Sequence, residues 1–140
     1  MLHYAFESGL TIHEIKALFG AVELTKYLND PAETAMGLAN STMITVRDGD
    51  KLVGLVRGLS DMHTGAFIQD LIVHPDYQHQ GIGHELLNEF IAYFKQIPQV
   101  VIVCSNPELQ SFFADAGFIA SDDTKSEMFI RKQQLLQPKF

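Results

Sequence analysis

The segment from Ala66 to Cys104 constrains the fold most, because its apolar pattern changes from strand-like to helical and back. Residues 66–73 (AFIQDLIV) are mostly apolar and are followed by His74-Pro75, a pair that disfavours further regular strand pairing. From 84 to 94 the apolar residues recur on one face of a helix, and residues 100–104 (VVIVC) have the pattern of a strand buried on both faces. Two strands joined through a helix are expected to lie parallel, with a right-handed crossover.

Two shorter helices are predicted before this segment. Residues 11–19 have helical spacing, with Thr11 as a candidate N-cap and Glu14 three residues later. Residues 31–39 begin with a proline at the first helical position and follow Asp30, a second candidate cap.

Strand signals lie on both sides of the central segment. Residues 43–47 and 51–59 are strand-like, and Asp48-Gly49-Asp50 between them is a strong hairpin signal. Downstream, a helix is predicted from Asn106-Pro107 to Ala116, and Phe118 onward with Met128 to Arg131 is predicted to form closing strands. This order of elements predicts one α/β domain, residues 1–140, in which a mixed sheet carries helices on both faces.

Charge and composition exclude several classes of protein. Ten Lys and Arg residues against seventeen Asp and Glu give a net charge of −7, which argues against nucleic acid as a partner. No apolar run approaches the roughly 18 residues of a membrane span, and the start of the chain has no signal-peptide pattern. Cys104 is the single cysteine, and no pair of histidines has metal-ligand spacing with a supporting carboxylate. We therefore expect a cytoplasmic protein with no membrane contact, no internal disulfide and no metal site.

The loop between the central strand and its helix is the best candidate for a binding site. It reads Gln78, His79, Gln80, Gly81, Ile82, Gly83. Backbone N–H groups at a helix N-terminus lack partners within the helix, and glycines allow a ligand to approach them, which together favour an anion such as a pyrophosphate. The alternative is that the glycines only permit a tight turn.

Two nucleotide-binding motifs fail on spacing. A dinucleotide fingerprint requires a third glycine three residues after Gly83, where the chain has Leu86. A phosphate-binding loop of the Walker type requires Lys and Ser or Thr after the last glycine, where the chain has His84 and Glu85.

Ile68 to Ile91 (IQDLIVHPDYQHQGIGHELLNEFI) resembles motif A of the GCN5-related N-acetyltransferases, the GNAT family. Its elements are a strand, a V-x-P-like exit, a [QR]-x-x-G-x-[GA] loop and a helix. A second similarity is VVIVCSN (100–106), followed by a helix that ends in FFADAGF (112–118). The resemblance covers roughly residues 10–131. It implies a mostly antiparallel mixed sheet with a splayed central parallel strand pair.

The resemblance also implies a binding site for acetyl-CoA. In this family the loop amides bind the pyrophosphate, which places it on Gln78 through Gly83, with His84 at the start of the helix. The pantetheine arm lies between the splayed strands and pairs with the backbone of the first one, here Leu71, Ile72 and Val73. Asn106 matches an asparagine that commonly reaches this arm, although it is equally well placed as a helix N-cap.

The chemistry implied is direct transfer of acetyl from a thioester to a primary amine, whose proton must be removed. Phe113 stands where many relatives have a tyrosine that protonates the departing thiolate, so it is a candidate cofactor contact and not an acid. Gln69 replaces a glutamate of some relatives, which leaves Asp70 as the candidate catalytic carboxylate. In an unbroken strand Asp70 shares a face with Ile68 and Ile72, so a buried structural role is the alternative. A β-bulge, which is common next to active sites, would change the face that Asp70 meets.

The sequence is therefore interpreted as an acetyl-CoA-dependent N-acetyltransferase acting on a small-molecule or peptide amine. The alternative is a non-catalytic acyl-CoA-binding or regulatory module, because Phe113 and Gln69 both depart from the family pattern. Dimerisation is frequent in the family, and a homodimer through the C-terminal strands is left open.

Overall fold

The computed structural model describes residues 1–103 and 107–131. Its centre is a five-stranded sheet in the order β1-β2-β3-β4-β5. The strands are β1 (Leu2–Phe6), β2 (Thr42–Asp48), β3 (Lys51–Ser60), β4 (Gly65–Val73) and β5 (Gln99–Ile102). The helices are α1 (Ile12–Ala21), α2 (Pro31–Ala39), α3 (Ile82–Tyr93) and α4 (Gln110–Asp115), with short 3-10 turns η1 (Thr25–Leu28), η2 (Pro75–Tyr77), η3 (Pro107–Leu109) and η4 (Ser121–Asp123).

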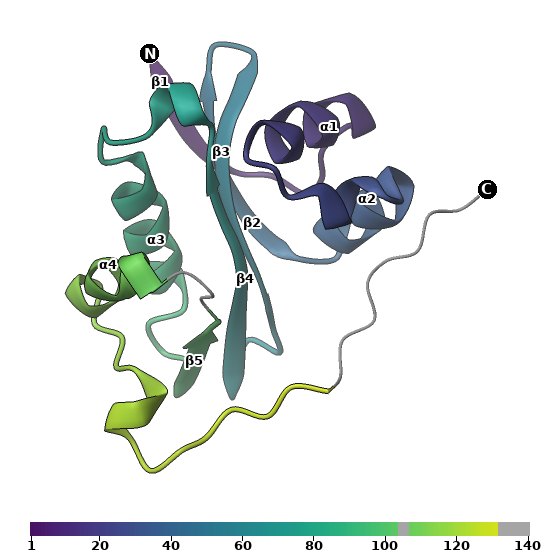
Figure 1. Cartoon of the computed structure of the whole chain (residues 1–140). Helices are drawn as coiled ribbons and strands as arrows, with labels where there is room; N and C mark the ends of the chain where they lie inside the picture. Colours follow the sequence, from purple (N-terminus) through teal and green to yellow (C-terminus); the bar gives the residue numbers. More distant parts are fainter. Residues whose placement is uncertain (104–106, 132–140) are drawn as a thin grey trace.

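The sheet is mixed, as predicted. Neighbouring strands from β1 to β4 are antiparallel, whereas β4 and β5 are parallel and are connected through α3. Figure 1 shows the sheet edge-on, with α1 and α2 on one face and α3 and α4 on the other. The predicted α/β architecture with helices on both faces is confirmed.

Each face of the sheet has its own apolar core. On the α3 face, Leu86 and Phe90 pack with Val56 and Ile68, all fully buried. On the α1 and α2 face, the buried residues are Ile15, Leu18, Phe19, Tyr27, Leu38, Met43, Leu52, Leu55 and Ile72. Burial of these apolar side chains holds the helices against the strands.

The helix caps form as the sequence predicts. The Thr11 hydroxyl accepts from the backbone N–H of Glu14, while the Glu14 carboxylate accepts from the backbone N–H of Thr11. Asp30 accepts from the backbone N–H of Glu33 at the start of α2. The β2–β3 turn has Gly49 at φ +60°, the left-handed region that glycine adopts without strain.

A β-bulge at Gln69 changes the direction of the side chains along β4. Arg57 pairs with Asp70, but the next residue of β3, Gly58, pairs with Ile68. Gln69 is therefore an extra residue, and Ile68 and Ile72 belong to the cores on opposite faces. The strand is therefore interrupted, so Asp70 does not share a face with Ile68 and lies on the α1 and α2 face with Ile72.

Two local predictions at the C-terminal side are also wrong. Described residues 118–131 contain η4 and no strand, and the side chains of Met128, Phe129 and Ile130 are 54 %, 88 % and 55 % exposed. A strand-like composition does not by itself supply a neighbouring strand to pair with. β5 is not buried on both faces either, because Val101 is 41 % exposed.

Candidate active site

Strands β4 and β5 pair over only part of the length of β4. Their register runs from Gly65 with Gln99 to Ile68 with Ile102, and β5 ends there. In contrast, β3 stays paired with β4 as far as Val73. In the part of the chain that the structure describes, residues 69–73 of β4 thus have one edge without a neighbouring strand. The gap opens at the bulge.

The loop that follows β4 is held against the end of the strand. The side-chain amide of Gln78 donates to the carbonyl of Val73 at 2.9 Å, and the ring Nδ1 of His74 accepts from the backbone N–H of Asp76. His79 and Gly81 both have positive φ, +64° and +84°. The chain changes direction at these two residues and then enters α3. The predicted loop residues 78–83 and His84 therefore lie together at the N-terminus of α3.

Most backbone N–H groups of this loop are unbonded in the described part of the chain: that of Gln78 donates to the carbonyl of Pro75 at 3.4 Å, but those that follow it up to α3 do not donate. None of the hydrogen bonds found in residues 1–103 and 107–131 uses the N–H groups of residues 79–84, and Glu85 is the first to donate, to the carbonyl of Gly81. The side chains of residues 78–81 and of His84 are exposed. Unpartnered amides at the positive end of a helix form an anion-binding site.

The two glycines of the loop differ in what requires them. Gly81 has the left-handed φ that the turn needs. Gly83 does not, and a Cβ there would make only ordinary contacts with Phe112 (3.6 Å) and Val73 (3.8 Å). The tight turn therefore explains why residue 81 is a glycine, but it does not explain why residue 83 is one.

Asp70 is buried in an ion pair beside the gap. Its carboxylate accepts from the Nε of Arg57 at 2.6 Å and from the hydroxyl of Tyr27 at 3.0 Å. The side chains of Arg57 and Asp70 are only 6 % and 9 % exposed. Burial raises the pKa of Tyr27, and the charge of Asp70 raises it further, so the hydroxyl keeps its proton.

Further contacts fix this cluster in place. The Gln69 side-chain amide donates to the hydroxyl of Tyr27 at 3.4 Å, and the Arg57 guanidinium donates to Ser41 and lies over the Tyr27 ring. Thr34 of α2 donates to the carbonyl of Tyr27 at 2.7 Å. The bulge of β4, the end of α2 and the η1 turn are thereby connected.

Phe113 lies in α4, packed against the core under α3. Its ring makes edge contacts with Phe112 at 5.2 Å and Phe118 at 6.2 Å between centroids. The Phe112 ring in turn contacts the His84 ring at 4.3 Å, which places α4 beside the loop. Asn106 and Cys104 lie outside the described residues.

Tyr27 and Arg57 are missed by the sequence analysis. A tyrosine 43 residues from Asp70 carries no local signal. Arg57 does carry one, because a single arginine within the apolar run LVGLVRGL requires a buried partner. Within the described residues, no group of three or more His, Cys, Asp or Glu side chains could hold a metal ion, and no helix is long and apolar enough to cross a membrane.

Comparison with known proteins assigns the family. The model of the acetyltransferase (GNAT) domain matches residues 15–135. The uncharacterized N-acetyltransferase ycf52 of Pyropia yezoensis is 27 % identical over 134 residues, which cover 91 % of this chain and 76 % of that protein. GCN5-related N-acetyltransferase 1, chloroplastic, of Arabidopsis thaliana is 26 % identical over 90 % of this chain and 66 % of its own length. A GNAT family acetyltransferase of Streptococcus pneumoniae has the same fold, with a TM-score of 0.75 and 28 % identity over 95 % of this chain and all of that one.

The chain therefore belongs to the GNAT acetyltransferase family. It is an N-acetyltransferase, and the family generally uses acetyl-CoA as the acetyl donor.

Proposed function

We propose that this protein transfers acetyl from the CoA thioester to a primary amine by direct attack of the amine. The observation that carries the proposal is the position of the unpartnered amides of residues 79–84 at one end of the unpaired edge of β4. Five strand residues, 69–73, span about 13 Å between this loop and the point where β4 and β5 pair.

The described residues fit acetyl-CoA along this path. Gln78 through Gly83 and His84 would hold the pyrophosphate, and the unexplained Gly83 fits a ligand that approaches the backbone closely. The backbone of Leu71, Ile72 and Val73 would pair with the amides of the pantetheine arm as an added strand does. Asn106 and Phe113 stay predictions as contacts of the arm.

The chemistry requires a path for two protons, because the ammonium loses one before attack and the amine nitrogen loses another, to water or to the departing thiolate, as the amide forms. A primary amine with a pKa near 10.4 arrives mostly protonated and must lose a proton to attack. Asp70 remains our proposed catalytic carboxylate, and its contacts favour a role through the Tyr27 hydroxyl and water, because Arg57 and Tyr27 occupy its oxygens. The tetrahedral oxyanion would be stabilised by backbone N–H groups at the bulge.

Phe113 has no proton to give to the departing thiolate. A thiol with a pKa near 8.5 is a tolerable leaving group, so the thiolate is proposed to leave without a protein acid. The same residue, with Gln69, favours the second candidate, a non-catalytic acyl-CoA-binding or regulatory module.

Two measurements on the same protein separate these functions. Calorimetric titration with acetyl-CoA measures binding, and a free-thiol assay with a diverse panel of amines measures transfer. Binding with amine-dependent thiol release supports the enzyme, binding without release for any amine supports the regulatory module, and absence of binding contradicts both.

A charge placed in the loop tests the anion site. Gly83→Asp adds a carboxylate at the N-terminus of α3, where it does not weaken the helix, but it repels phosphate. We expect the affinity for acetyl-CoA to fall at least about tenfold. Asn88→Asp adds the same charge at an exposed position of α3 and should leave the affinity unchanged.

The acceptor is a small-molecule or peptide amine. Structures with the same fold at 18 % identity include an aminoglycoside acetyltransferase and a ribosomal-protein-alanine N-acetyltransferase, so the fold admits both classes. The single domain over residues 1–140, the cytoplasmic location and the homodimer stay proposals. For the homodimer, the predicted closing strands are not formed by described residues 118–131.

A further inference from the structure

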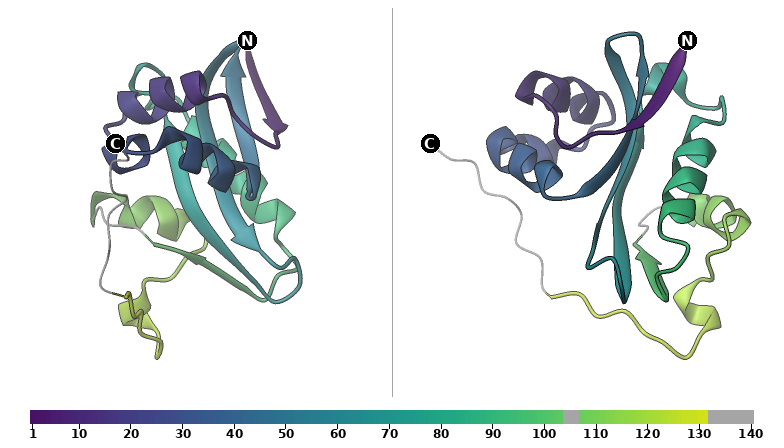
Figure 2. Two further views of the ribbon diagram at one scale, coloured as in Figure 1. Left: turned by 90° about the vertical axis from the view of Figure 1, so that its right-hand side faces the viewer. Right: turned by 180° about the vertical axis from the view of Figure 1, so that it is seen from behind.

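The face of the sheet that carries α1 and α2 is only partly covered by them. Figure 2 (left) looks onto this face and shows both helices over its upper part. Leu59, Phe67 and Val101 lie on the uncovered part, side by side on β3, β4 and β5, because Leu59 pairs with Phe67 and Phe67 with Val101. We call these three residues the apolar strip. Leu59 and Val101 are 45 % and 41 % exposed.

The apolar strip forms the floor of a cavity of about 630 Å³. Its remaining lining residues are Ser60, Asp61, Gly65, Ala66 and Gln99. The cavity is an open depression in the sheet surface, since Leu59 and Val101 are exposed and Phe67 between them is half-buried.

The strip ends where the gap between β4 and β5 begins. Phe67 and Val101 each lie one residue before the last paired residues, Ile68 and Ile102. The next side chains of β4 on the same face are those of Gln69 and Asp70, at the bulge. A molecule seated on the strip therefore lies next to the end of the proposed acetyl site.

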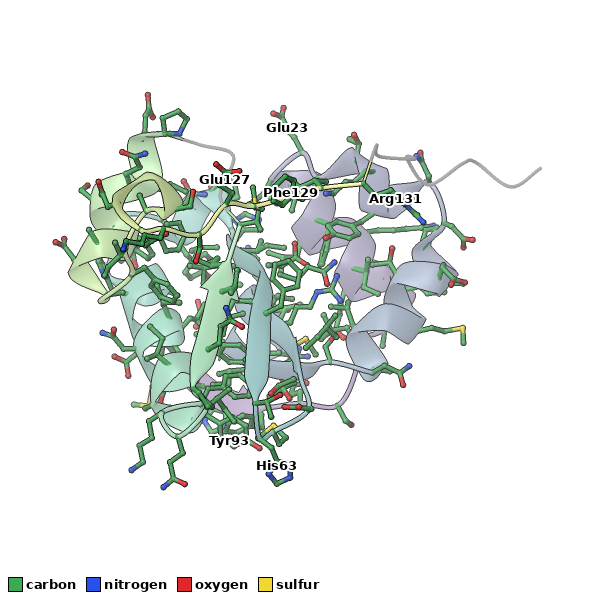
Figure 3. The ribbon with its side chains drawn as sticks, turned by 90° about the horizontal axis from the view of Figure 1, so that it is seen from below. Glu23, His63, Tyr93, Glu127, Phe129 and Arg131 are labelled. Carbon is green, nitrogen blue, oxygen red and sulfur yellow. The ribbon has the colours of Figure 1, made fainter. Side chains whose placement is uncertain are left out.

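The form of this surface favours an extended polypeptide. Sites for small molecules enclose most of their ligand, whereas this depression is open. In the described parts of the chain no strand pairs with the outer edge of β5, and an extended polypeptide can bind such an edge as an added strand. In Figure 3, Phe129 and Arg131 lie at the opposite side of the molecule from His63, which belongs to the turn between β3 and β4.

Charge favours a cationic polypeptide. The Asp61 carboxylate at the far end of the cavity accepts from Thr64 and from the backbone N–H groups of His63, Thr64 and Gly65. These hydrogen bonds keep the pKa of Asp61 far below its usual range, so the carboxylate stays charged. The net charge of −7 acts in the same direction at long range.

We infer that the acceptor is a polypeptide amine whose neighbouring apolar residue lies on the apolar strip, with the chain of the acceptor along the outer edge of β5. This inference rests on the proposed acetyl transfer. In that step the nitrogen of the neutral, free amine of the polypeptide bonds to the carbonyl carbon of the acetyl group. The carbon–sulfur bond breaks with its electron pair leaving on the CoA sulfur, and one proton of the amine nitrogen passes to water.

The test compares three acceptors in the free-thiol assay. They are the peptide amides Met-Leu-Phe and Gly-Ser-Gly, both with a free α-amine, and 2-phenylethylamine. The variants Leu59→Ser and Val101→Thr reduce the apolar character of the strip, and Met36→Ser changes a 63 % exposed methionine on α2, outside the cavity lining, as a control.

We expect each strip variant to raise the KM for Met-Leu-Phe amide about fivefold, because apolar contact area is lost. The KM for Gly-Ser-Gly amide, the affinity for acetyl-CoA and all parameters of Met36→Ser should stay unchanged.

Other outcomes overturn the inference. If 2-phenylethylamine is the best acceptor and the variants affect only it, the strip binds small amines. If Leu59→Ser lowers the melting temperature without changing any KM, the chain's own residues cover the strip. If thiol release is equal for both peptides and unchanged by the variants, the strip is not an acceptor site, but the proposed acetyl transfer stands. If acetyl-CoA binds without thiol release for any amine, both the inference and the proposed acetyl transfer are refuted.

Discussion

Two arginines on the same face of the sheet form ion pairs of different kinds. Arg57 of β3 pairs with one carboxylate, Asp70, and both side chains are less than one-tenth exposed. Arg47 of β2 pairs with two carboxylates, Glu7 and Glu14, and the three side chains are 20 %, 27 % and 22 % exposed. The first lies at the gap of the candidate site, and the second ties α1 and the chain after β1 to β2.

The difference shows how burial determines what each ion pair does. A buried charge must be matched, and Tyr27 and Ser41 supply the hydrogen bonds that Asp70 and Arg57 still need. The Arg47 cluster, which consists of Arg47, Glu7 and Glu14, has a net charge of −1. This excess charge is tolerated because all three side chains are partly in contact with water. Loss of a partner should therefore be costly in the first cluster and moderate in the second.

Arg57→Met should give the largest effect on stability. It leaves the buried Asp70 carboxylate without its cation, which we expect to lower the free energy of unfolding by about 3–5 kcal/mol. Urea denaturation measures this difference. The double variant Arg57→Met with Asp70→Leu should be more stable than the single one, and a loss below about 1 kcal/mol in the single variant would show that the pair is not buried as described.

Tyr27→Phe should have the next largest effect. It removes the hydrogen bond to the charged Asp70 and the long one from the Gln69 amide, but it keeps the ring that packs at right angles to Phe19, so the expected loss is about 1.5–2 kcal/mol. The same measurement applies. Tyr93→Phe, which removes a hydroxyl from a 48 % exposed tyrosine on α3, is the control and should change little.

Arg47→Met should cost less at neutral pH. The lost hydrogen bonds to Glu7 (2.8 Å) and Glu14 (2.5 Å) are partly replaced by water, and the expected loss is about 1–1.5 kcal/mol. A loss as large as that of Arg57→Met would contradict the distinction between the two clusters.

Acid should weaken the Arg47 cluster gradually. The hydrogen bond from Arg47 lowers the pKa of Glu7 below its ordinary value near 4.5. Burial raises the pKa of Glu14, but the hydrogen bonds from Arg47 and Thr11 together lower it below the same value. Since both carboxylates bind protons less readily in the folded state, their stabilisation is present above pH 4.5 and is lost as the pH falls through the lowered values. Each contributes at most about 1.4 kcal/mol per pH unit.

Thermal melting between pH 6 and pH 3 measures this loss. Arg47→Met should flatten the dependence, because the hydrogen bonds from Arg47 that lower the pKa values of Glu7 and Glu14 are lost. An equally steep decrease in that variant would assign the acid response to other groups.

Much of the fold could be predicted from local patterns. The capping box at Thr11, the Asp30 cap, the Asp48-Gly49-Asp50 hairpin and the strand–loop–helix segment depend on residues close in sequence. The position of the binding loop is predicted for the same reason. β1 was not predicted, because its five residues show no clear pattern and are positioned by pairing with β2.

The catalytic side of the site could not be predicted in this way. Whether Asp70 is paired depends on Arg57 from β3 and Tyr27 from η1, which only the packing of three elements brings together. The bulge at Gln69, which turns Asp70 towards α1 and α2, is visible only in the register of β3 and β4. The prediction of closing strands from Phe118 onward was wrong for a related reason, since a strand forms only where another strand offers an edge to pair with.

The sequence alone determined the order of helices and strands, the anion-binding loop and the resemblance to the acetyltransferase family, because caps, turns and periodic apolar residues act over a few positions. Only the tertiary structure decided where β4 and β5 separate, which groups surround Asp70 and which part of the sheet stays open as the apolar strip. Those features depend on how far α1, α2 and β5 extend over strands distant in the chain, and that extent is set by packing rather than by any local pattern.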